Sequence, residues 1–220
     1  MRVRSGAPDP LLILASSSPR RRELLARLGA PFEVRAADLD ETPHLGESPE
    51  DLVRRLATSK AEAVLAAAPE PDIVVVAADT IVVVDGVILT KPLNAADATV
   101  MLGRLAGCTH TVLTGVAVAR GTWPAGSADS GVPPPSRTVS VVVEVEATEV
   151  TFVELTDADI AWYVATGEPL DKAGGYGIQG QGAVFVSSIV GSHDNVVGLG
   201  LATTRRLLTQ AGFDPLTPTA

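Results

Sequence analysis

The stretch 72-DIVVVAADTIVVVDGVILT-90 decides the fold of this chain. Residues 72–79 form a continuous apolar run that ends on Asp79, and such runs are typical of strands buried on both faces of a sheet. Further on, Asp85-Gly86 separates two β-branched runs, which predicts a hairpin with a two-residue turn. We therefore expect the core to be built around this strand and hairpin.

Helix and strand patterns alternate on both sides of this stretch. An apolar strand at 11–15 precedes a helix that Ser18 caps, with Pro19 in its first turn, and Ser48-Pro49 begins a second helix in the same way. Further strands are expected at 31–36, 109–120, 138–155 and 183–191, and further helices at 94–107, 156–163 and 195–212. This alternation predicts an α/β protein, and 220 residues suffice for one large domain or two small ones.

Composition and charge restrict the class of protein. The chain is 46% hydrophobic, which is enough for a core, and its net charge of −9 repels nucleic acid and anionic membranes. Its single cysteine, Cys108, excludes a disulfide framework and a cysteine-rich zinc site. The apolar run at 11–15 is too short for a signal peptide or a membrane span. These features predict a soluble, cytoplasmic protein that binds neither nucleic acid nor membranes.

Three consecutive arginines, Arg20 to Arg22, occupy the first turn of the first expected helix. The N-terminus of a helix carries a partial positive charge, so each cation there costs about 0.3–1 kcal/mol. The second expected helix has acids, Glu50 and Asp51, in its first turn and follows the rule. An anionic ligand bound to the free N–H groups of the arginine-bearing turn would remove the conflict.

The unusual charged residues of the chain suit a phosphate chain with a divalent cation. They are four cations and two acids: Arg20, Arg21, Lys60, Lys91, Glu41 and Asp79. Arginine makes forked contacts with phosphate oxygens, lysine supplies a point charge, and carboxylates hold a hard cation such as Mg²⁺. Taken singly, three of them have a simpler interpretation: Asp79 as the start of a turn, and Lys60 and Lys91 as solvated surface residues.

Several other patterns do not point to a site. Gly175-x-Gly177-x-x-Gly180 matches the letters of the dinucleotide-binding fingerprint, but that fingerprint opens a helix and this one opens a strand. No phosphate-binding loop of the Walker type occurs in the sequence. Ser16 to Ser18 lack the surroundings of a catalytic serine. The histidines have no metal-binding spacing; they are His44, His110 and His193.

Four motifs together resemble one family. In chain order they are ASSSPRRRELL, AADTIVVVDGVILTKP, HTVLTGVAV and GEPLDKAGGYGIQG, and the resemblance spans about Leu11 to Gly212. They resemble the Maf proteins, the septum-formation-type nucleoside triphosphate pyrophosphatases. The resemblance implies one α/β domain over residues 1–220, with an elongated mixed β-sheet flanked by helices, similar to the inosine triphosphatase-like fold. It also implies a homodimer.

The resemblance further implies an activity and a set of site residues. The activity is cleavage between the α and β phosphates of a nucleoside triphosphate with a divalent metal, Mg²⁺ or Mn²⁺. The implied roles are phosphate binding for Ser16, Arg20, Arg21, Lys60 and Lys91, metal binding for Glu41, and proton acceptance and metal binding for Asp79.

In such families, three positions are associated with the choice of substrate. Here they are Arg20, Thr80 and Gln179, and this combination resembles the dTTP/UTP branch. Glutamine can offer a pyrimidine edge both a donor and an acceptor, which glutamate cannot. Two alternatives stay open: an enzyme that removes noncanonical purine triphosphates, and a non-catalytic nucleotide sensor. Roles in division arrest and in keeping modified nucleotides out of nucleic acids are part of the same expectation.

The chain departs from the compact family pattern in two segments. Ten residues precede the first expected strand, and residues 121–137 form an insertion rich in Gly, Pro and Ser. We interpret the insertion as a long hairpin loop and not as a domain linker, because the strands on either side can pair.

Overall fold

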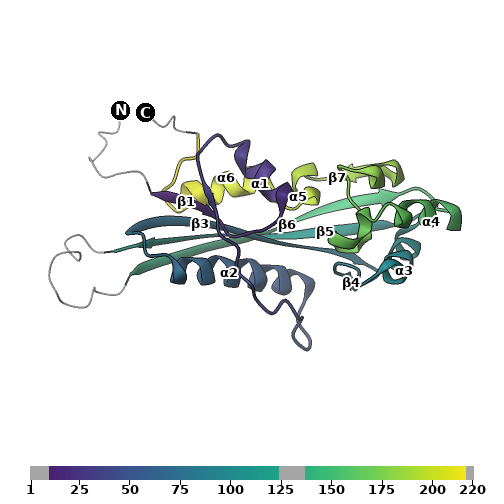
Figure 1. Ribbon diagram of the computed structural model, residues 1–220, viewed down its shortest axis with the longest axis horizontal. Coiled ribbons are helices and arrows are strands. Elements are labelled where there is room, and N and C mark those ends of the chain that lie inside the picture. Colours follow the sequence, from purple (N-terminus) through teal and green to yellow (C-terminus); the bar gives the residue numbers. More distant parts are fainter. Residues whose placement is uncertain (1–9, 124–136, 217–220) are drawn as a thin grey trace.

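The computed structural model describes residues 10–123 and 137–216, and its strands form one seven-stranded sheet with helices on both faces (Figure 1). Strand order is β2-β1-β3-β5-β6-β7, and β4 pairs with the end of β3. The β1–β2 and β1–β3 pairs are parallel, and the other pairs are antiparallel. The strands are β1 (Leu11–Leu14), β2 (Glu33–Val34), β3 (Asp72–Val84), β4 (Val87–Leu89), β5 (Thr109–Thr122), β6 (Thr138–Phe152) and β7 (Val186–Val190). The mixed sheet confirms the predicted fold class.

Helices cover the sheet from opposite sides (Figure 1). The long helix α2 covers one face, α1, α5 and α6 cover the other, and α3 and α4 lie at one end of the strands. Their bounds are α1 (Pro19–Ala26), α2 (Pro49–Ala67), α3 (Ala95–Leu105), α4 (Asp157–Ala165), α5 (His193–Val197) and α6 (Leu201–Gln210). Three 3₁₀ helices follow α4: η1 (Glu168–Asp171), η2 (Ala173–Gly175) and η3 (Gln181–Phe185).

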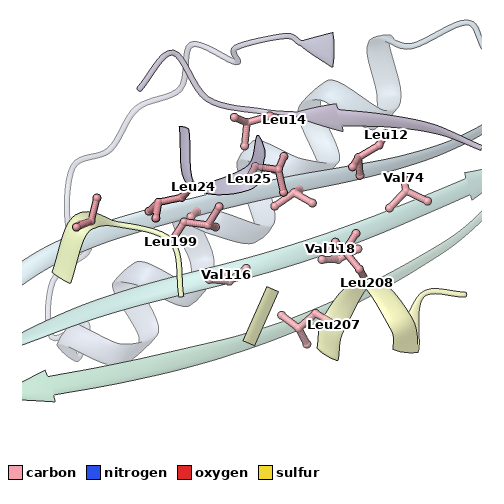
Figure 2. Packing of buried hydrophobic residues seen from close by; sticks show 13 residues of the cluster. Leu12, Leu14, Leu24, Leu25, Val74, Val116, Val118, Leu199, Leu207 and Leu208 are labelled. Carbon is pink, nitrogen blue, oxygen red and sulfur yellow. The ribbon is translucent and has the colours of Figure 1, made fainter. Parts of the chain in front are cut away.

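Strand β3 supplies the core of both layers. Side chains of a strand alternate between the two faces, so Val74 and Val76 pack with α1 and α6, while Ile73 and Val75 pack against α2. Figure 2 shows the first of these clusters, in which Leu12, Leu25, Val118 and Leu208 meet between the sheet and the helices. Burial on both faces explains why the run at 72–79 is apolar throughout.

The structure corrects three of the predicted elements. Strand β3 does not stop at Asp79 but continues to Val84, where the predicted Asp85-Gly86 turn leads into β4. The predicted strand at 183–191 begins only at Val186, since η3 precedes it. The predicted helix at 195–212 is two helices, because the chain breaks at Gly198, whose φ is +120°.

One edge of β3 changes partners halfway along. Residues 73–76 pair with β1, and residues 82–84 pair with β4. Between them, β1 ends and the chain turns into α1, so Asp79 and Thr80 lie where no strand of the described chain covers this edge of β3. Such a break in the order of an α/β sheet is where ligands commonly bind.

Gly115 allows α2 to approach the sheet next to this break. It pairs with Asp79 in the β3–β5 ladder, and a Cβ atom on Gly115 would overlap the carbonyl of Val53 in α2. Backbone atoms cannot move aside, so Gly115→Ala is expected to cost about 1–3 kcal/mol of stability and lower Tm by several degrees.

Gly103→Ala is the matched control for this substitution. Gly103 lies exposed inside α3, and nothing lies within 4 Å of its Cβ position. Alanine favours a helix over glycine, so this variant should hold or raise Tm. Thermal unfolding of both variants checks the prediction, and an unchanged Tm for Gly115→Ala would contradict it.

Two predicted segments fall on residues whose structure is not described. The N-terminal lead lies mostly within 1–9, and the predicted loop insertion lies mostly within 124–136. In the ranges that are described, no helix is both long and apolar enough to cross a membrane.

Candidate active site

A cavity of about 690 Å³ opens at the break along β3. Its wall comes from the turn between β1 and α1, the acidic loop before α2, α2 itself, the middle of β3 and the glycine-rich segment around η2. The nine residues that the sequence singles out all lie in this wall: Ser16, Arg20, Arg21, Glu41, Lys60, Asp79, Thr80, Lys91 and Gln179. The fold thus brings them together, while their individual roles stay predictions.

Lys60 lies between the two carboxylates of the cavity. Its Nζ atom is 2.6 Å from Asp79 Oδ1 and 2.5 Å from Glu41 Oε1. Lys60 and Asp79 are only 8% and 7% exposed and form a buried ion pair, whereas Glu41 reaches in from an exposed loop. The simpler interpretation of Lys60 as a surface residue is therefore wrong, because α2 carries it on the stripe that faces the sheet.

Charges around Glu41 favour its ionised form. Burial raises the pKa of the Glu41 carboxyl, but the hydrogen bond and charge of Lys60 outweigh that effect, with smaller contributions from Lys91 and Arg21, and the net pKa is lowered. Glu41 therefore stays ionised in an environment with three cations. At neutral pH this carboxylate can therefore bind a cation.

Arg21 lies on the opposite face of β3 from Lys60. Its Nε atom donates to the Gly198 carbonyl oxygen at 2.9 Å, and its Nη2 atom donates to Thr80 Oγ1 at 3.0 Å. Burial lowers the pKa of Arg21, and the carboxylate of Asp79 raises it in part. The Gly198 carbonyl is free to accept this bond because the chain breaks between α5 and α6. The break that the sequence analysis did not predict therefore helps to hold Arg21.

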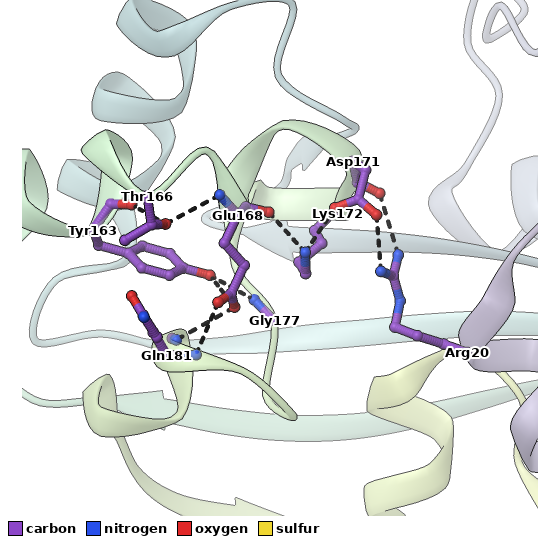
Figure 3. A network of polar contacts seen from close by, with 9 residues as sticks. Arg20, Tyr163, Thr166, Glu168, Asp171, Lys172, Gly177 and Gln181 are labelled. Atoms are coloured by element: carbon purple, nitrogen blue, oxygen red, sulfur yellow. Dashed lines mark hydrogen bonds and ion pairs between the residues drawn. The ribbon is translucent and has the colours of Figure 1, made fainter.

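Arg20 and Arg22 have different surroundings. Arg20 Nη1 donates to Asp171 Oδ2 at 2.9 Å, which ties α1 to η1 (Figure 3). Burial raises the pKa of Asp171, but hydrogen bonds from Lys172 and Arg20 lower it by more than burial raises it. The net pKa of Asp171 is therefore lowered. Arg22 is exposed and does not line the cavity. Asp171 thus offsets part of the unfavourable charge that the helix start carries.

Two serines shape the turn at the start of α1. Ser18 caps the helix, and its Oγ accepts from the Arg21 backbone N–H at 3.4 Å. The buried Ser16 has an Oγ that accepts from the Ser18 backbone N–H at 3.2 Å. The predicted cap is confirmed. These bonds fix the start of α1 and with it the direction in which the Arg20 and Arg21 side chains extend.

Lys91 and Gln179 are exposed residues in the cavity wall. Lys91 follows β4, and its charge reaches Glu41 across the cavity. Gln179 lies in a tight turn in which the Gly180 N–H donates to the Gly177 carbonyl at 3.2 Å. Both side chains can therefore meet a ligand that enters from solvent.

Tyr176 connects the cavity wall to a buried aromatic cluster. Its hydroxyl hydrogen-bonds His110 Nε2 at 2.8 Å, and both rings pack edge-on against Phe152. Tyr176 lies in the glycine-rich segment and His110 in β5. This contact anchors the glycine-rich segment to the sheet.

His110 makes stability depend on pH. Burial lowers the pKa of His110 to about 4 from its usual 6.5, so the folded protein keeps the ring neutral where the unfolded chain protonates it. His110 therefore makes its full contribution to the free energy of unfolding above pH 6.5, and this contribution, on the order of 3 kcal/mol, is lost as the pH drops towards 4.

Chemical denaturation at pH 7, 6, 5 and 4 measures this effect. His110→Gln keeps a hydrogen-bonding group for Tyr176 but does not titrate in this range. Its unfolding free energy should fall less steeply between pH 6.5 and 4 than that of the natural protein. Equal slopes would contradict the assignment to His110.

The donor atoms of the cavity fit a divalent cation that arrives with phosphate. Among the residues that the structure describes, no group of three His, Cys, Asp or Glu side chains is placed to hold a metal. Glu41 and Asp79, however, present two carboxylates whose oxygens contact the same ammonium group. Mg²⁺ commonly takes one or two carboxylates together with water and substrate phosphate oxygens, which matches this set.

Sequence reasoning gave little weight to several residues of this region. Glu168, Asp171, Lys172 and Tyr176 were not among the predicted site residues, although all four lie within the motif GEPLDKAGGYGIQG. The sequence held a stronger signal for Lys60. It lies one helical turn after Leu56 and Ala57, on the same apolar stripe of α2. A lysine on the buried stripe of a helix indicates a buried partner of opposite charge.

Comparisons with known proteins place the chain in one family. The family model described as "Maf-like protein" matches residues 11–211. Proteins named dTTP/UTP pyrophosphatase are similar over nearly their whole length. The one from Anaeromyxobacter dehalogenans (strain 2CP-C) is 52% identical, covering 93% of this chain and 95% of the relative, and that from Symbiobacterium thermophilum is 49% identical, covering 92% and 94%. The one from Shewanella oneidensis is 48% identical, covering 92% and 98%. This chain therefore belongs to the family of Maf-like proteins.

Proposed function

We propose that this protein hydrolyses dTTP and UTP to the nucleoside monophosphate and pyrophosphate. The observation that supports this most directly is the buried Lys60–Asp79 pair at the base of a cavity that Arg20, Arg21 and Lys91 also line. An isolated buried ion pair is costly, and a cavity that gathers further cations around it suits a polyanionic ligand. The names of the relatives support the same substrate class.

The reaction breaks one phosphoanhydride bond. Water attacks the α-phosphorus, the bond from that phosphorus to the oxygen bridging to the β-phosphate breaks, and pyrophosphate leaves. Asp79 is the proposed acceptor of the proton from water, because it is the buried carboxylate at the base of the cavity. Lys60 lies against Asp79 and keeps the carboxylate oriented in the absence of substrate.

Charge on the phosphates is met by the cations of the wall. Arg21 is held from behind by Gly198 and Thr80, so its guanidinium needs little reorganisation to face a phosphate. A divalent cation bound by Glu41 and Asp79 would neutralise phosphate charge and orient the phosphate chain. Ser16 lies beside the same helix start and completes the proposed phosphate-binding set.

Base preference is proposed to depend on Gln179. It is exposed in a turn of the cavity wall and can offer a pyrimidine edge one donor and one acceptor. Thr80 contributes indirectly, because its hydroxyl accepts from Arg21. Arg20 is held by Asp171 at the neighbouring part of the wall.

A purified-protein assay tests the proposal. Pyrophosphate release is measured with Mg²⁺ or Mn²⁺ and a panel of dTTP, UTP, CTP, dGTP and modified purine triphosphates. We expect dTTP and UTP to give the highest kcat/KM, and a chelator to abolish release. Higher values for a purine triphosphate would contradict the pyrimidine preference, and tight nucleotide binding without pyrophosphate release would identify a sensor.

A further inference from the structure

The carboxylate of Glu168 is the centre of a hydrogen-bond network behind the cavity wall (Figure 3). Its Oε1 atom accepts from the Tyr163 hydroxyl at 2.8 Å, and its Oε2 atom accepts from the Gln181 backbone N–H at 2.9 Å. The Tyr163 hydroxyl in turn accepts from the Gly177 backbone N–H at 3.0 Å. The Gly182 backbone N–H also donates to Oε1, at 3.5 Å. One carboxylate and one fully buried tyrosine therefore hold three backbone amides of the glycine-rich segment.

Two of these amides bracket Gln179 symmetrically. Gly177 lies two residues before it and Gln181 two residues after it, and the turn between them is closed by the bond from the Gly180 N–H to the Gly177 carbonyl. Gln179 itself is exposed in the cavity wall. Its position is thus set by its neighbours' contacts with Glu168 and Tyr163.

The glycines of this segment make room for the same carboxylate. A Cβ atom on Gly180 would overlap the Glu168 carboxylate, and one on Gly177 would lie 2.9 Å from Glu168 Oε1. Close packing against Glu168, and for Gly177 also against Lys172, therefore explains the second and third glycines of the Gly-x-Gly-x-x-Gly spacing. The first, Gly175, has a φ of +72°, which favours glycine.

Glu168 and Tyr163 do not themselves line the cavity, whereas Gly177, Gln179 and Gly180 do. Any effect of Glu168 on a ligand must therefore pass through the turn that carries Gln179. On the phosphate side, Arg20 is bound by Asp171. Lys172 links Asp171 to Glu168, but it does so through the Glu168 backbone carbonyl and not through the carboxylate (Figure 3). A change in the Glu168 carboxylate should alter recognition of the base more than recognition of the phosphates.

We infer that Glu168 and Tyr163 are positioning residues that set base selectivity by fixing the turn around Gln179. This inference rests on the proposed function for its substrate and for the assignment of base recognition to Gln179. Glu168→Gln keeps the shape and one acceptor oxygen but cannot accept from both Tyr163 and Gln181 as the carboxylate does. Tyr163→Phe keeps the ring and removes the acceptor for the Gly177 N–H.

The experiment compares kcat/KM for dTTP and dGTP in the natural protein, the two single variants and the double variant. We expect Glu168→Gln to lower the dTTP:dGTP ratio at least tenfold, mainly through a higher KM for dTTP. Tyr163→Phe should act in the same direction. The double variant should lose less than the product of the single losses, because both residues belong to one network. The inhibition constant of inorganic tripolyphosphate should stay within twofold in all variants.

Asp159→Asn is the matched control. Asp159 is a structural carboxylate in the capping box of α4, the helix that carries Tyr163, and it lies outside the cavity wall. This variant should lower Tm and leave the ratio unchanged. If the dTTP:dGTP ratio of Glu168→Gln stays within twofold of the natural value, the inference is overturned. If Glu168→Gln does not fold, the same criterion is applied to Tyr163→Phe.

Binding separates this inference from the proposed function. The dissociation constants of dTTP and dGTP, measured by calorimetry, provide the same ratio without turnover. If the natural protein releases no pyrophosphate, the proposed function fails, while the binding ratio in the variants still supports or overturns the role of Glu168.

Discussion

Asp79→Asn is expected to lower kcat for dTTP by about 10²–10⁴-fold, the range typical of a lost general base. Asparagine has nearly the same shape, so it fits the buried position in β3, but it cannot accept the proton from water. Lys60 keeps Glu41 as a partner, which limits the loss of stability. Initial rates of pyrophosphate release at saturating dTTP, together with Tm, measure the effect.

Asp72→Asn is the control for this variant. Asp72 begins the same strand and pairs with Arg120 far from the cavity wall. Because a surface ion pair contributes little to stability, Asp72→Asn should fold normally. Because Asp72 does not line the cavity, the variant should also keep kcat within about twofold of the natural value. Near-natural turnover in Asp79→Asn would exclude Asp79 as the proton acceptor.

Arg21→Ala is expected to lower kcat/KM for dTTP by about 100-fold, whereas its neighbour Arg22 should be replaceable. A charge-assisted hydrogen bond to phosphate contributes about 1.5–3 kcal/mol, which corresponds to roughly 10- to 150-fold. Arg21 is fixed in the cavity by Gly198 and Thr80, and Arg22 is exposed outside it. Arg20→Ala should also weaken turnover strongly, because Arg20 lines the same wall.

The three arginine variants are compared by kcat/KM and by the inhibition constant of pyrophosphate. Arg22→Ala should stay within twofold of the natural protein in both values. Arg21→Lys should recover only part of the loss, since lysine cannot form the forked contact. Equal effects of Arg21→Ala and Arg22→Ala would show that the arginines act only through the general field at the helix start.

Much of the fold can be predicted because its signals are local. The apolar run at 72–79, the Asp85-Gly86 turn and the caps Ser18 and Ser48 each depend on neighbouring residues, and each is found in the structure, although the strand continues to Val84. One prediction failed although its local pattern was continuous. The helical pattern after residue 195 continues in sequence, but Gly198 adopts a positive φ and ends α5.

The site could be predicted only as a set of residues and not as an arrangement. Motif resemblance collected residues as distant in sequence as Ser16 and Gln179, and the structure places them around one cavity. Which cation meets which acid could not be predicted: Lys60 pairs with Asp79, and Arg20 pairs with Asp171. These pairs depend on the register of strands and on the side of β3 that each residue faces.

The sequence by itself determined the buried strand, the hairpin, the helix starts and the chemistry of the charged residues, because these follow from the order of neighbouring side chains. Only the tertiary structure decided that Asp79 faces α2 while Thr80 faces α1, and that the glycine-rich segment packs around Glu168. The physical reason is that a contact between distant segments forms only when the strands between them have taken one register, since a shift by one residue would turn every side chain to the other face of the sheet.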